Sequence, residues 1–472
     1  MVEQRSIDSK VLAWYEFTEG CRILYIGKKD DKLFGFLKDK KLQVELEPGR
    51  NQYDYLIYIN NFVDVNKITE NMKYLKDDGI ILVGFNNKYG ISKFLSYDSE
   101  NRVSALEKDN GEYASIKKIK QVLENTGYIH SNLYMPFPNI NRVDMICTNK
   151  IDNISDKIDK YFVEYDDEMT VLAREIDLLR NISIYNIDTF ECLANSYLME
   201  FSKNNISTDV KYVSYNNYRK EEYQLITIIE DDVVEKKPAT YKSINNIKRI
   251  GEELKYLNNY NIEILDKYEN NKLYSTFIKE RKTYDVELSN YANSDELISK
   301  LNDYKEIFKN NSVKFDKSIK REFIEPLKKE NEEILNKLNY LEYAFYDMVP
   351  KNCFYIDNKY YFFDQEWMEK YLPVEFIIYR SIINSYDLVK KIDVDKLLEK
   401  IGLLEYRELF DRIENYLRKR IVDEEKLKKL NKNYRKMYEE LYDKKVLEIK
   451  NNELKVTIEN QNQYIKELQE DV

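Results

Sequence analysis

Apolar residues in the first 150 positions fall into short continuous runs separated by stretches of mixed polarity. Three of these runs occupy residues 22–27, 53–59 and 79–84. Short runs without alternation are typical of strands buried on both faces of a parallel sheet, with helices between them. We therefore predict an α/β, Rossmann-like domain over residues 1–150. A mostly helical connector is expected to follow over residues 151–205.

The pattern changes at about residue 206. Strand-like runs over residues 223–229 and 233–237 come first, and helical spacing dominates after residue 240. The first helix of this part is marked by apolar residues on one face, namely Ile244, Ile247, Leu254 and Leu257. A small β lobe followed by a helical lobe predicts an α+β, bilobal domain over residues 206–425.

The last segment, residues 426–472, is polar with one apolar helical stripe. Its apolar positions are Leu427, Leu430, Tyr434, Met437 and Leu441, and then, after a phase shift, Leu454, Ile458, Ile465 and Leu468. Spacing of three and four with lysine and glutamate between predicts a coiled coil, and so a homo-oligomer. For the first part of the segment, an amphipathic helix lying on the preceding domain is the alternative.

Composition narrows the class of protein. A chain of 472 residues is long for one hydrophobic core, so two or three domains are expected. The 75 Lys and Arg against 85 Asp and Glu give a net charge of −10, which argues against a nucleic-acid partner. Since the sequence has neither an apolar run of 18 residues nor a signal-peptide pattern, we expect no transmembrane segment and a cytoplasmic location.

The cysteines do not predict a zinc site. Cys21, Cys147, Cys192 and Cys353 lack any CxxC spacing, and His130 is the single histidine in the sequence. Ordinary Cys/His zinc sites need four such ligands at close spacing. We expect all four cysteines to be small buried hydrophobic residues.

A candidate catalytic loop lies in the C-terminal half. Phosphoryl transfer requires a carboxylate to accept the hydroxyl proton and oxygen ligands for metal ions near the phosphates. Asp347 and Asn352 have the Asp-x-x-x-x-Asn spacing that places both groups on one loop. Asp347 is therefore the predicted base, and Asn352 a predicted metal ligand.

A second metal carboxylate follows at the expected distance. Strand-like residues 353–356, a turn at 357–359 and residues 360–363 predict a β-hairpin that leads directly into Asp364. Together with the preceding loop and the sequence Asp-x-Glu-Trp, this pattern resembles the aminoglycoside-phosphotransferase and choline-kinase branch of kinase-like enzymes. The resemblance implies ATP and Mg²⁺ as cofactors, with Asp364 as a metal ligand.

The same resemblance extends upstream. It implies that Lys236, at the end of a strand, binds the nucleotide phosphates, and that Glu252 or Glu253 pairs with this lysine. Lys236 is favoured over Lys237 because it shares the face of Val234. Residues 277–280 resemble the segment that receives the adenine.

Two features depart from the family. Phe345 stands where a histidine usually precedes the catalytic aspartate, and residues 212–223, where the phosphate loop should lie, contain no glycine.

The N-terminal domain resembles class I S-adenosylmethionine-dependent methyltransferases. The resemblance rests on the strand ending at Gly27, the strand over 53–57, residues 75–91 and the segments 115–128 and 134–138. It implies Gly27 beneath the cofactor and a carboxylate, Glu45 or Glu47, on the ribose hydroxyls.

This domain is expected to be degenerate. Gly27 is followed by Lys28 and Lys29, whose side chains would crowd the cofactor, and the interval to Tyr53 is too short for the usual βαβ unit. We therefore expect no binding of S-adenosylmethionine.

The order of domains resembles bifunctional proteins that phosphorylate and methylate the end of a bacterial surface polysaccharide. It implies an ATP- and magnesium-dependent phosphotransferase acting on a sugar or glycan hydroxyl. One alternative is a methyltransferase of the same pathway. Another is a non-catalytic scaffold whose coiled coil organises glycosyltransferases.

Overall fold

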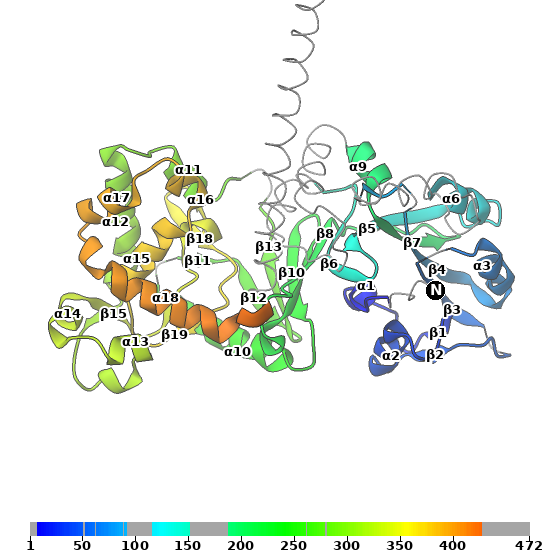
Figure 1. The fold of residues 1–472 in the computed structure, drawn as a ribbon, viewed down its shortest axis with the longest axis horizontal. Helices are drawn as coiled ribbons and strands as arrows, with labels where there is room; N and C mark the ends of the chain where they lie inside the picture. The colour runs from blue at the N-terminus through cyan, green and yellow to red at the C-terminus, as the bar shows by residue number, and fades with distance from the viewer. Residues whose placement is uncertain are drawn as a thin grey trace, which may run out of the picture. The chain divides into compact units, whose positions relative to one another are not determined.

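The computed structural model describes residues 7–50, 52–61, 63–87, 89–91, 116–151, 187–260, 262–278 and 281–426, with no side-chain detail at 187–189. The described chain divides after Ser207 into two units, of which the second is Thr208–Asp423. In Figure 1 the first unit runs from blue to green and the second from green to orange. The predicted coiled coil beyond residue 426 and most of the predicted connector lie outside the described residues.

Seven strands among the described residues of the first unit form a mixed sheet in the order β2-β1-β3-β4-β7-β5-β6. The strands are β1 (Arg22–Tyr25), β2 (Gln43–Glu45), β3 (Tyr53–Ile59), β4 (Leu75–Asn86), β5 (His130–Asn139), β6 (Arg142–Cys147) and β7 (Ser196–Ser202). The helices are α1 (Lys10–Ala13), α2 (Lys32–Asp39), α3 (Val65–Asn71), α6 (Ile116–Glu124) and α9 (Ile187–Leu193).

The parallel part of this sheet confirms an α/β arrangement. β1 pairs in parallel with β2 on one side and with β3 on the other, and β3 pairs in parallel with β4. β7 then joins β4 and β5 in antiparallel register. The strand order reverses at β1, and the carboxyl end of such a strand is where open α/β sheets bind ligands.

One expectation for this region was wrong. The interval between Gly27 and Tyr53 does hold a βαβ unit, because α2 and β2 fit within it and β2 lies parallel to β1. The unit is compressed, since α2 has only eight residues and β2 only three.

The second unit begins with an antiparallel sheet in the order β12-β13-β10-β9-β8 and continues into a helical lobe (Figure 1). Its strands are β8 (Tyr212–Tyr215), β9 (Leu225–Ile229), β10 (Val233–Pro238), β11 (Glu263–Ile264), β12 (Asp266–Glu269), β13 (Lys272–Thr276), β14 (Ser312–Lys314), β15 (Asn339–Leu341), β16 (Ala344–Phe345), β17 (Cys353–Ile356), β18 (Lys359–Phe362), β19 (Met368–Glu369) and β20 (Leu372–Pro373). Its helices are α10 (Ile244–Glu253), α11 (Tyr284–Ser289), α12 (Asp295–Lys309), α13 (Glu325–Lys328), α14 (Glu332–Lys337), α15 (Val374–Ile383), α16 (Tyr386–Val389), α17 (Val394–Lys400) and α18 (Arg407–Ile421).

Apolar spacing explains both lobes of this unit. Ile247 and Ile250 of α10 pack with Leu225 and Leu273 of the sheet in a small core. The helical lobe has a larger core of its own, in which Tyr304 and Phe308 of α12 are fully buried. Burial of such aromatic side chains stabilises the lobe by roughly 25 cal/mol for each Å² of apolar surface removed from water.

The hairpin that was predicted before Asp364 is confirmed. β17 and β18 pair in antiparallel register, with Cys353 opposite Phe362. Asp357 and Asn358 at the turn have φ values of 49° and 61°, the positive angles that a two-residue type I′ turn requires. Asp364 therefore follows β18 and lies beside the candidate catalytic loop, residues 347–352, which precedes β17.

Three of the four cysteines are buried, as the sequence predicted. These are Cys21, Cys147 and Cys353, whereas Cys192 is exposed, so the prediction of burial was wrong for that residue. Within the described ranges, no helix combines the length and apolar character that crossing a membrane requires.

Candidate active site

The candidate catalytic loop, residues 347–352, is held by hydrogen bonds to its main chain. The carbonyl oxygen of Asp347 accepts from the main-chain nitrogen of Val349 at 2.8 Å and from Nε2 of Gln365 at 3.1 Å. The buried hydroxyl of Tyr304 donates to the carbonyl oxygen of Met348 at 3.1 Å. These contacts fix the backbone beneath Asp347, so the position of its carboxylate is set by the helical lobe.

The Asp347 carboxylate lies on this rigid loop with 16% of its side chain exposed. It accepts no hydrogen bond within the described residues, and Nη2 of Arg380 is 3.6 Å from its Oδ1. Burial raises the pKa of Asp347, and the Arg380 guanidinium offsets part of that rise. A partly exposed carboxylate with unused lone pairs and a raised pKa is suited to accept a proton.

Asn352 is brought to the same loop, as its spacing predicted. Its Nδ2 donates to the carbonyl oxygen of Asp347 at 3.2 Å, and the residue is buried. Its amide oxygen makes no hydrogen bond among the described residues, so it remains available as a metal ligand.

Asp364 follows β18 in a strained conformation. Its φ is 62°, in the left-handed region that costs a residue with a Cβ about 1–2 kcal/mol. The Oδ1 atom accepts a hydrogen bond from Nζ of Lys236, while Oδ2 has no partner within the described ranges. Such strain persists where the surrounding structure holds it, which is common at functional sites.

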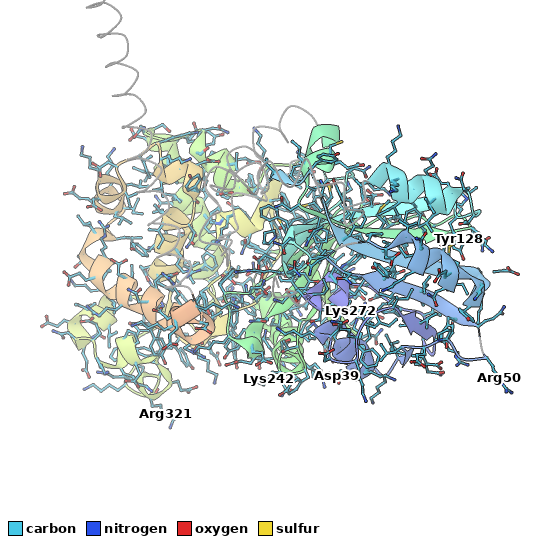
Figure 2. All side chains as sticks on the ribbon, turned by 45° about the vertical axis from the view of Figure 1, so that its right-hand side comes forward. Asp39, Arg50, Tyr128, Lys242, Lys272 and Arg321 are labelled. Atoms are coloured by element: carbon cyan, nitrogen blue, oxygen red, sulfur yellow. The ribbon has the colours of Figure 1, made fainter. Side chains whose placement is uncertain are left out.

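Lys236 on β10 is the cation that joins the two lobes of this unit. Its ammonium group donates to Asp364 and also to Oε1 of Glu366. Lys237 points to the other face of β10, where Glu235 is 3.6 Å away. Glu235 also accepts at 3.0 Å from Lys272, which is labelled in Figure 2. The alternation of side chains along the strand thus places Lys236 at the site.

The expected pairing of Lys236 with a carboxylate of α10 is not found in the structure. Glu252 is exposed to solvent, and Glu253 pairs with Arg249 one helical turn earlier. The ammonium group of Lys236 is instead paired with Asp364 and Glu366, which lie in the segment that follows β18.

Glu366 is the buried anion of the site, with 2% of its side chain exposed. Burial opposes its ionisation, but Arg219 and Lys236 outweigh burial and hold the pKa of Glu366 well below its usual range. Nη1 of Arg219 donates to Oε2 at 2.5 Å. In the same cluster, burial raises the pKa of Asp364, and the charge of Glu366 adds to that rise.

Three residues of this site were missed from the sequence. Arg380 could have been suspected, because it is the one cation on the mostly apolar helix α15 and such residues are rarely buried unpaired. Glu366 is part of the Asp-x-Glu-Trp motif, but nothing in the sequence pairs it with Lys236. Arg219 gave no signal, because its partner is 147 positions away.

The two features that depart from the kinase-like pattern have the following places in the structure. Phe345 is buried in β16, where it pairs with β19 rather than reaching the site. The connection between β8 and β9, which contains no glycine, is joined to the end of α18 by main-chain hydrogen bonds. The nitrogen of Lys220 donates to the oxygen of Ile421 at 2.9 Å, and that of Asp423 donates to the oxygen of Tyr218 at 3.0 Å.

The segment expected to receive the adenine is only partly described. The nitrogen of Phe277 donates to the oxygen of Asp232 at 2.8 Å, at the end of β13. Residues 279–280 lie outside the described residues.

The described residues offer few side chains that could bind a metal ion at this site. No group of three His, Cys, Asp or Glu side chains in the described ranges is arranged to hold a metal ion. Mg²⁺ bound with a nucleotide does not need such a cage, because one or two protein ligands are completed by phosphate oxygens and water. The amide oxygen of Asn352 and Oδ2 of Asp364 fit that smaller requirement.

A cavity of about 340 Å³ lies beside the catalytic loop in the same unit. Its lining includes Tyr346, Trp367, Glu253, Glu369 and Arg420. Arg420 pairs with Glu369, and Arg249 pairs with Glu253. Burial raises the pKa of Glu253 to about 7, and Glu369 adds to the rise while Arg249 opposes it.

The turn after β1 in the first unit is occupied by its own side chains. A Cβ on Gly27 would lie 2.3 Å from the ring of Tyr25 and 2.7 Å from Oδ2 of Asp31. Tyr25 donates to that oxygen at 2.9 Å, and the nitrogen of Lys28 donates to it at 2.7 Å. Lys28 and Lys29, which were expected to crowd the cofactor, are exposed, and Tyr25 and Asp31 occupy the turn itself.

Glu45 ends β2 but is already engaged. Its Oε1 accepts from Arg22 at 2.8 Å, and its Oε2 accepts from the hydroxyl of Tyr53. The hydrogen bond from Tyr53 and the charge of Arg22 lower the pKa of Glu45. Arg22 and Tyr53 are the first residues of β1 and β3, so this carboxylate contacts the amino ends of these two strands. Glu47 is exposed.

Comparison with known proteins gives weak similarity to two kinds of fold. No family model and no curated protein matches the chain. The ADP-bound aminoglycoside phosphotransferase APH(2'')-Ib is 15% identical, with a TM-score of 0.28 over 48% of this chain and 92% of its own. A streptomycin–ATP complex of APH(2'')-IIa is 14% identical, with a TM-score of 0.26 over 39% of this chain and 77% of its own.

The other kind is methyltransferase-like. A SAM-dependent methyltransferase from Archaeoglobus fulgidus is 14% identical, with a TM-score of 0.24 over 41% of this chain and 92% of its own. Similarity at this level concerns the fold alone, so the chemistry of each unit must be judged from its own residues.

The raised pKa of Glu253 predicts a pH-dependent stability. Between the ordinary glutamate pKa of about 4.3 and the folded value near 7, the folded protein holds a proton that the unfolded chain releases. This group therefore makes the protein less stable as the pH rises through that window. Glu253→Gln should raise the melting temperature relative to wild type more at pH 8 than at pH 4.5.

Differential scanning fluorimetry across that range provides the measurement. Arg249→Gln removes the opposing cation and should make the loss of stability with pH larger than in wild type. A Glu253→Gln difference that stays constant with pH would contradict the assignment.

The filled turn in the first unit predicts no measurable binding of S-adenosylmethionine. Tyr25 and Asp31 occupy the approach to Gly27, and Glu45 is committed to Arg22 and Tyr53. Isothermal titration of the full chain should give no heat beyond dilution. Micromolar affinity would show that the turn rearranges to admit the cofactor.

Proposed function

We propose that the second unit is an ATP- and magnesium-dependent phosphotransferase that acts on a hydroxyl of a sugar or glycan. The observation that carries the proposal is the convergence of Lys236, Asp364, Asn352 and Asp347. Lys236 contacts Asp364, and Asn352 contacts the main chain of Asp347. The two pairs meet where Gln365, the residue after Asp364, donates to the carbonyl oxygen of Asp347 at 3.1 Å, although the four residues span more than a hundred positions. Phosphoryl transfer depends on such positioning and on charge neutralisation rather than on covalent chemistry by the protein.

Each residue has a distinct role in this proposal. Lys236 binds phosphate oxygens, and Asp347 accepts the proton of the acceptor hydroxyl as that hydroxyl attacks. Asn352 and Asp364 would hold the magnesium ion, which neutralises the phosphate charge when it is bound. The pKa values of Asp347 and Asp364 are raised mainly by burial and further by neighbouring carboxylates, and a bound cation would favour the ionised form of both groups.

The acceptor class is proposed from the order of the domains alone. A methyltransferase-like unit before a kinase-like unit resembles proteins that modify bacterial surface polysaccharides. The first unit contributes no cofactor site to the proposal, because its glycine turn and its strand-end carboxylate are both engaged. Its methyltransferase alternative is therefore not carried further.

Nucleotide binding is the first test. Millimolar ATP with magnesium should raise the melting temperature of the full chain, because a ligand that binds only the folded state stabilises it by mass action. Asp364→Ala should abolish the shift, since it removes both a metal ligand and a partner of Lys236. Asp395→Ala, which removes an exposed aspartate paired with Arg407, should retain it. A wild-type protein indifferent to ATP and magnesium would refute the proposal.

Turnover separates an enzyme from a nucleotide-binding scaffold. Asp347→Asn should leave the ATP-induced shift nearly intact but lower turnover by roughly 10²–10⁴, the usual contribution of a general base. Transfer of labelled phosphate from ATP to sugar acceptors is the measurement, with Asp395→Asn as the control. Equal turnover in wild type and Asp347→Asn would remove Asp347 from the chemistry.

A further inference from the structure

We propose that Glu366 and Arg219 form a positioning pair that holds Lys236 for the nucleotide phosphates, in place of a carboxylate on helix α10. The inference rests on the proposed function, and it adds two residues that the sequence motif leaves without a role. Their contacts differ in kind from those of Asp364, and this difference assigns separate tasks to the two carboxylates that meet Lys236.

The geometry first identifies Glu366 as a permanent partner of Lys236. Both carboxylate oxygens are used, one by Lys236 and the other by Arg219 at 2.5 Å. Its main-chain oxygen also accepts from Nη2 of Arg249 at 3.1 Å. A carboxylate that is 2% exposed and bound on every side stays in place, because releasing it would leave buried charges unpaired.

Asp364 has the opposite character. Its side chain is 42% exposed, and only Oδ1 is engaged. It can therefore turn toward a metal ion without opening a buried cluster. When it does so, the hydrogen bond from Lys236 to Glu366 still keeps the lysine in place. The two carboxylates that contact Lys236 thus have different roles: Asp364 is a mobile metal ligand, and Glu366 is a fixed counter-ion.

The loop that supplies Arg219 is fixed rather than flexible. Arg219 forms a backbone bridge with Val422 at the end of α18, and its carbonyl oxygen accepts from Nε2 of Gln224 at 2.8 Å. Its guanidinium lies 5.4 Å from the centre of the Trp367 ring, a cation–π contact. Where a glycine-rich loop would offer backbone nitrogens to phosphates, this connection instead delivers a buried cation to Glu366.

Helix α10 does not compete for this task within the described residues. Glu252 is exposed, and Glu253 pairs with Arg249 and faces the neighbouring cavity. The matched control for Glu366 is therefore Glu253, a half-buried carboxylate on the helix that would otherwise supply the partner.

The first test needs no nucleotide. Acetylation of the full chain by acetic anhydride, with the rate at Lys236 followed by mass spectrometry, reports how firmly the amine of that lysine is held by its partners. Glu366→Gln should accelerate acetylation of Lys236 by about tenfold or more at pH 8, because the amine loses one of its two carboxylate partners and becomes free to react. Arg219→Ala should accelerate it less, and Glu253→Gln should not.

An unchanged rate in Glu366→Gln, or a faster rate in Glu253→Gln, overturns the assignment. If Glu366→Gln does not fold, the acetylation rates of Lys236 in Arg219→Ala and Glu366→Asp decide the assignment. The rate should rise in Arg219→Ala, whereas it should stay low in Glu366→Asp because this variant keeps the charge.

The second test asks whether the pair serves the phosphates. Glu366→Gln should weaken binding of MgATP by about tenfold or more while leaving adenosine affinity unchanged, because only the phosphates meet Lys236. Glu366→Asp should recover part of the loss. Equal weakening of both ligands would mean that Glu366 has a general structural role, and it would overturn the proposal.

The two failures are distinguishable. If the wild-type chain binds neither MgATP nor adenosine, the phosphotransferase function fails, whereas the acetylation rates still decide whether Glu366 holds Lys236.

Discussion

Lys236 is a buried cation whose position depends on two carboxylates from a distant part of the sequence, Asp364 and Glu366. β10 carries it from the antiparallel sheet, while Asp364 and Glu366 follow the β17–β18 hairpin that lies next to the catalytic loop. Breaking a buried ion pair by removing one partner typically costs 3–5 kcal/mol. The cluster therefore fixes the sheet against the helical lobe at the point where the candidate catalytic groups meet.

This constraint explains several features that are otherwise unrelated. Asp364, which accepts a hydrogen bond from Lys236, has a positive φ directly after the hairpin. The β8–β9 loop has no glycine, and it is held by backbone hydrogen bonds to the end of α18 and by the Arg219 ion pair. On the other side of the loop, Arg380 links Asp347 to Glu414 of α18, so the last helix of the unit contacts both ends of the site.

In the first unit, side chains of the chain itself occupy the turn at the switch point of the sheet. The parallel strands have an order that reverses at β1, and Tyr25 and Asp31 close the turn at Gly27. Glu45 stands at the end of β2 but bonds to Arg22 and Tyr53. The outline of such a sheet depends on apolar strands, whereas the ligand site depends on a few residues that can change without loss of the core.

Local sequence determined the elements and the groups that lie close together in the chain. Runs of apolar residues predicted β1, β3, β4 and β9, and turn residues predicted the hairpin, because strand burial and turn geometry depend on neighbours within a few positions. Asp347 and Asn352 were placed on one loop for the same reason. The compressed α2–β2 unit escaped prediction, since its short elements give little periodic signal.

Only the tertiary structure decided which charges meet. Lys236 was assigned a partner on α10 by resemblance, but packing of the hairpin against β10 gives it Asp364 and Glu366 instead. Arg219 and Glu366 are 147 positions apart, and no local pattern encodes such a contact. Buried charges must find partners wherever the fold brings them together, so the electrostatics of this site became visible only once the chain was folded.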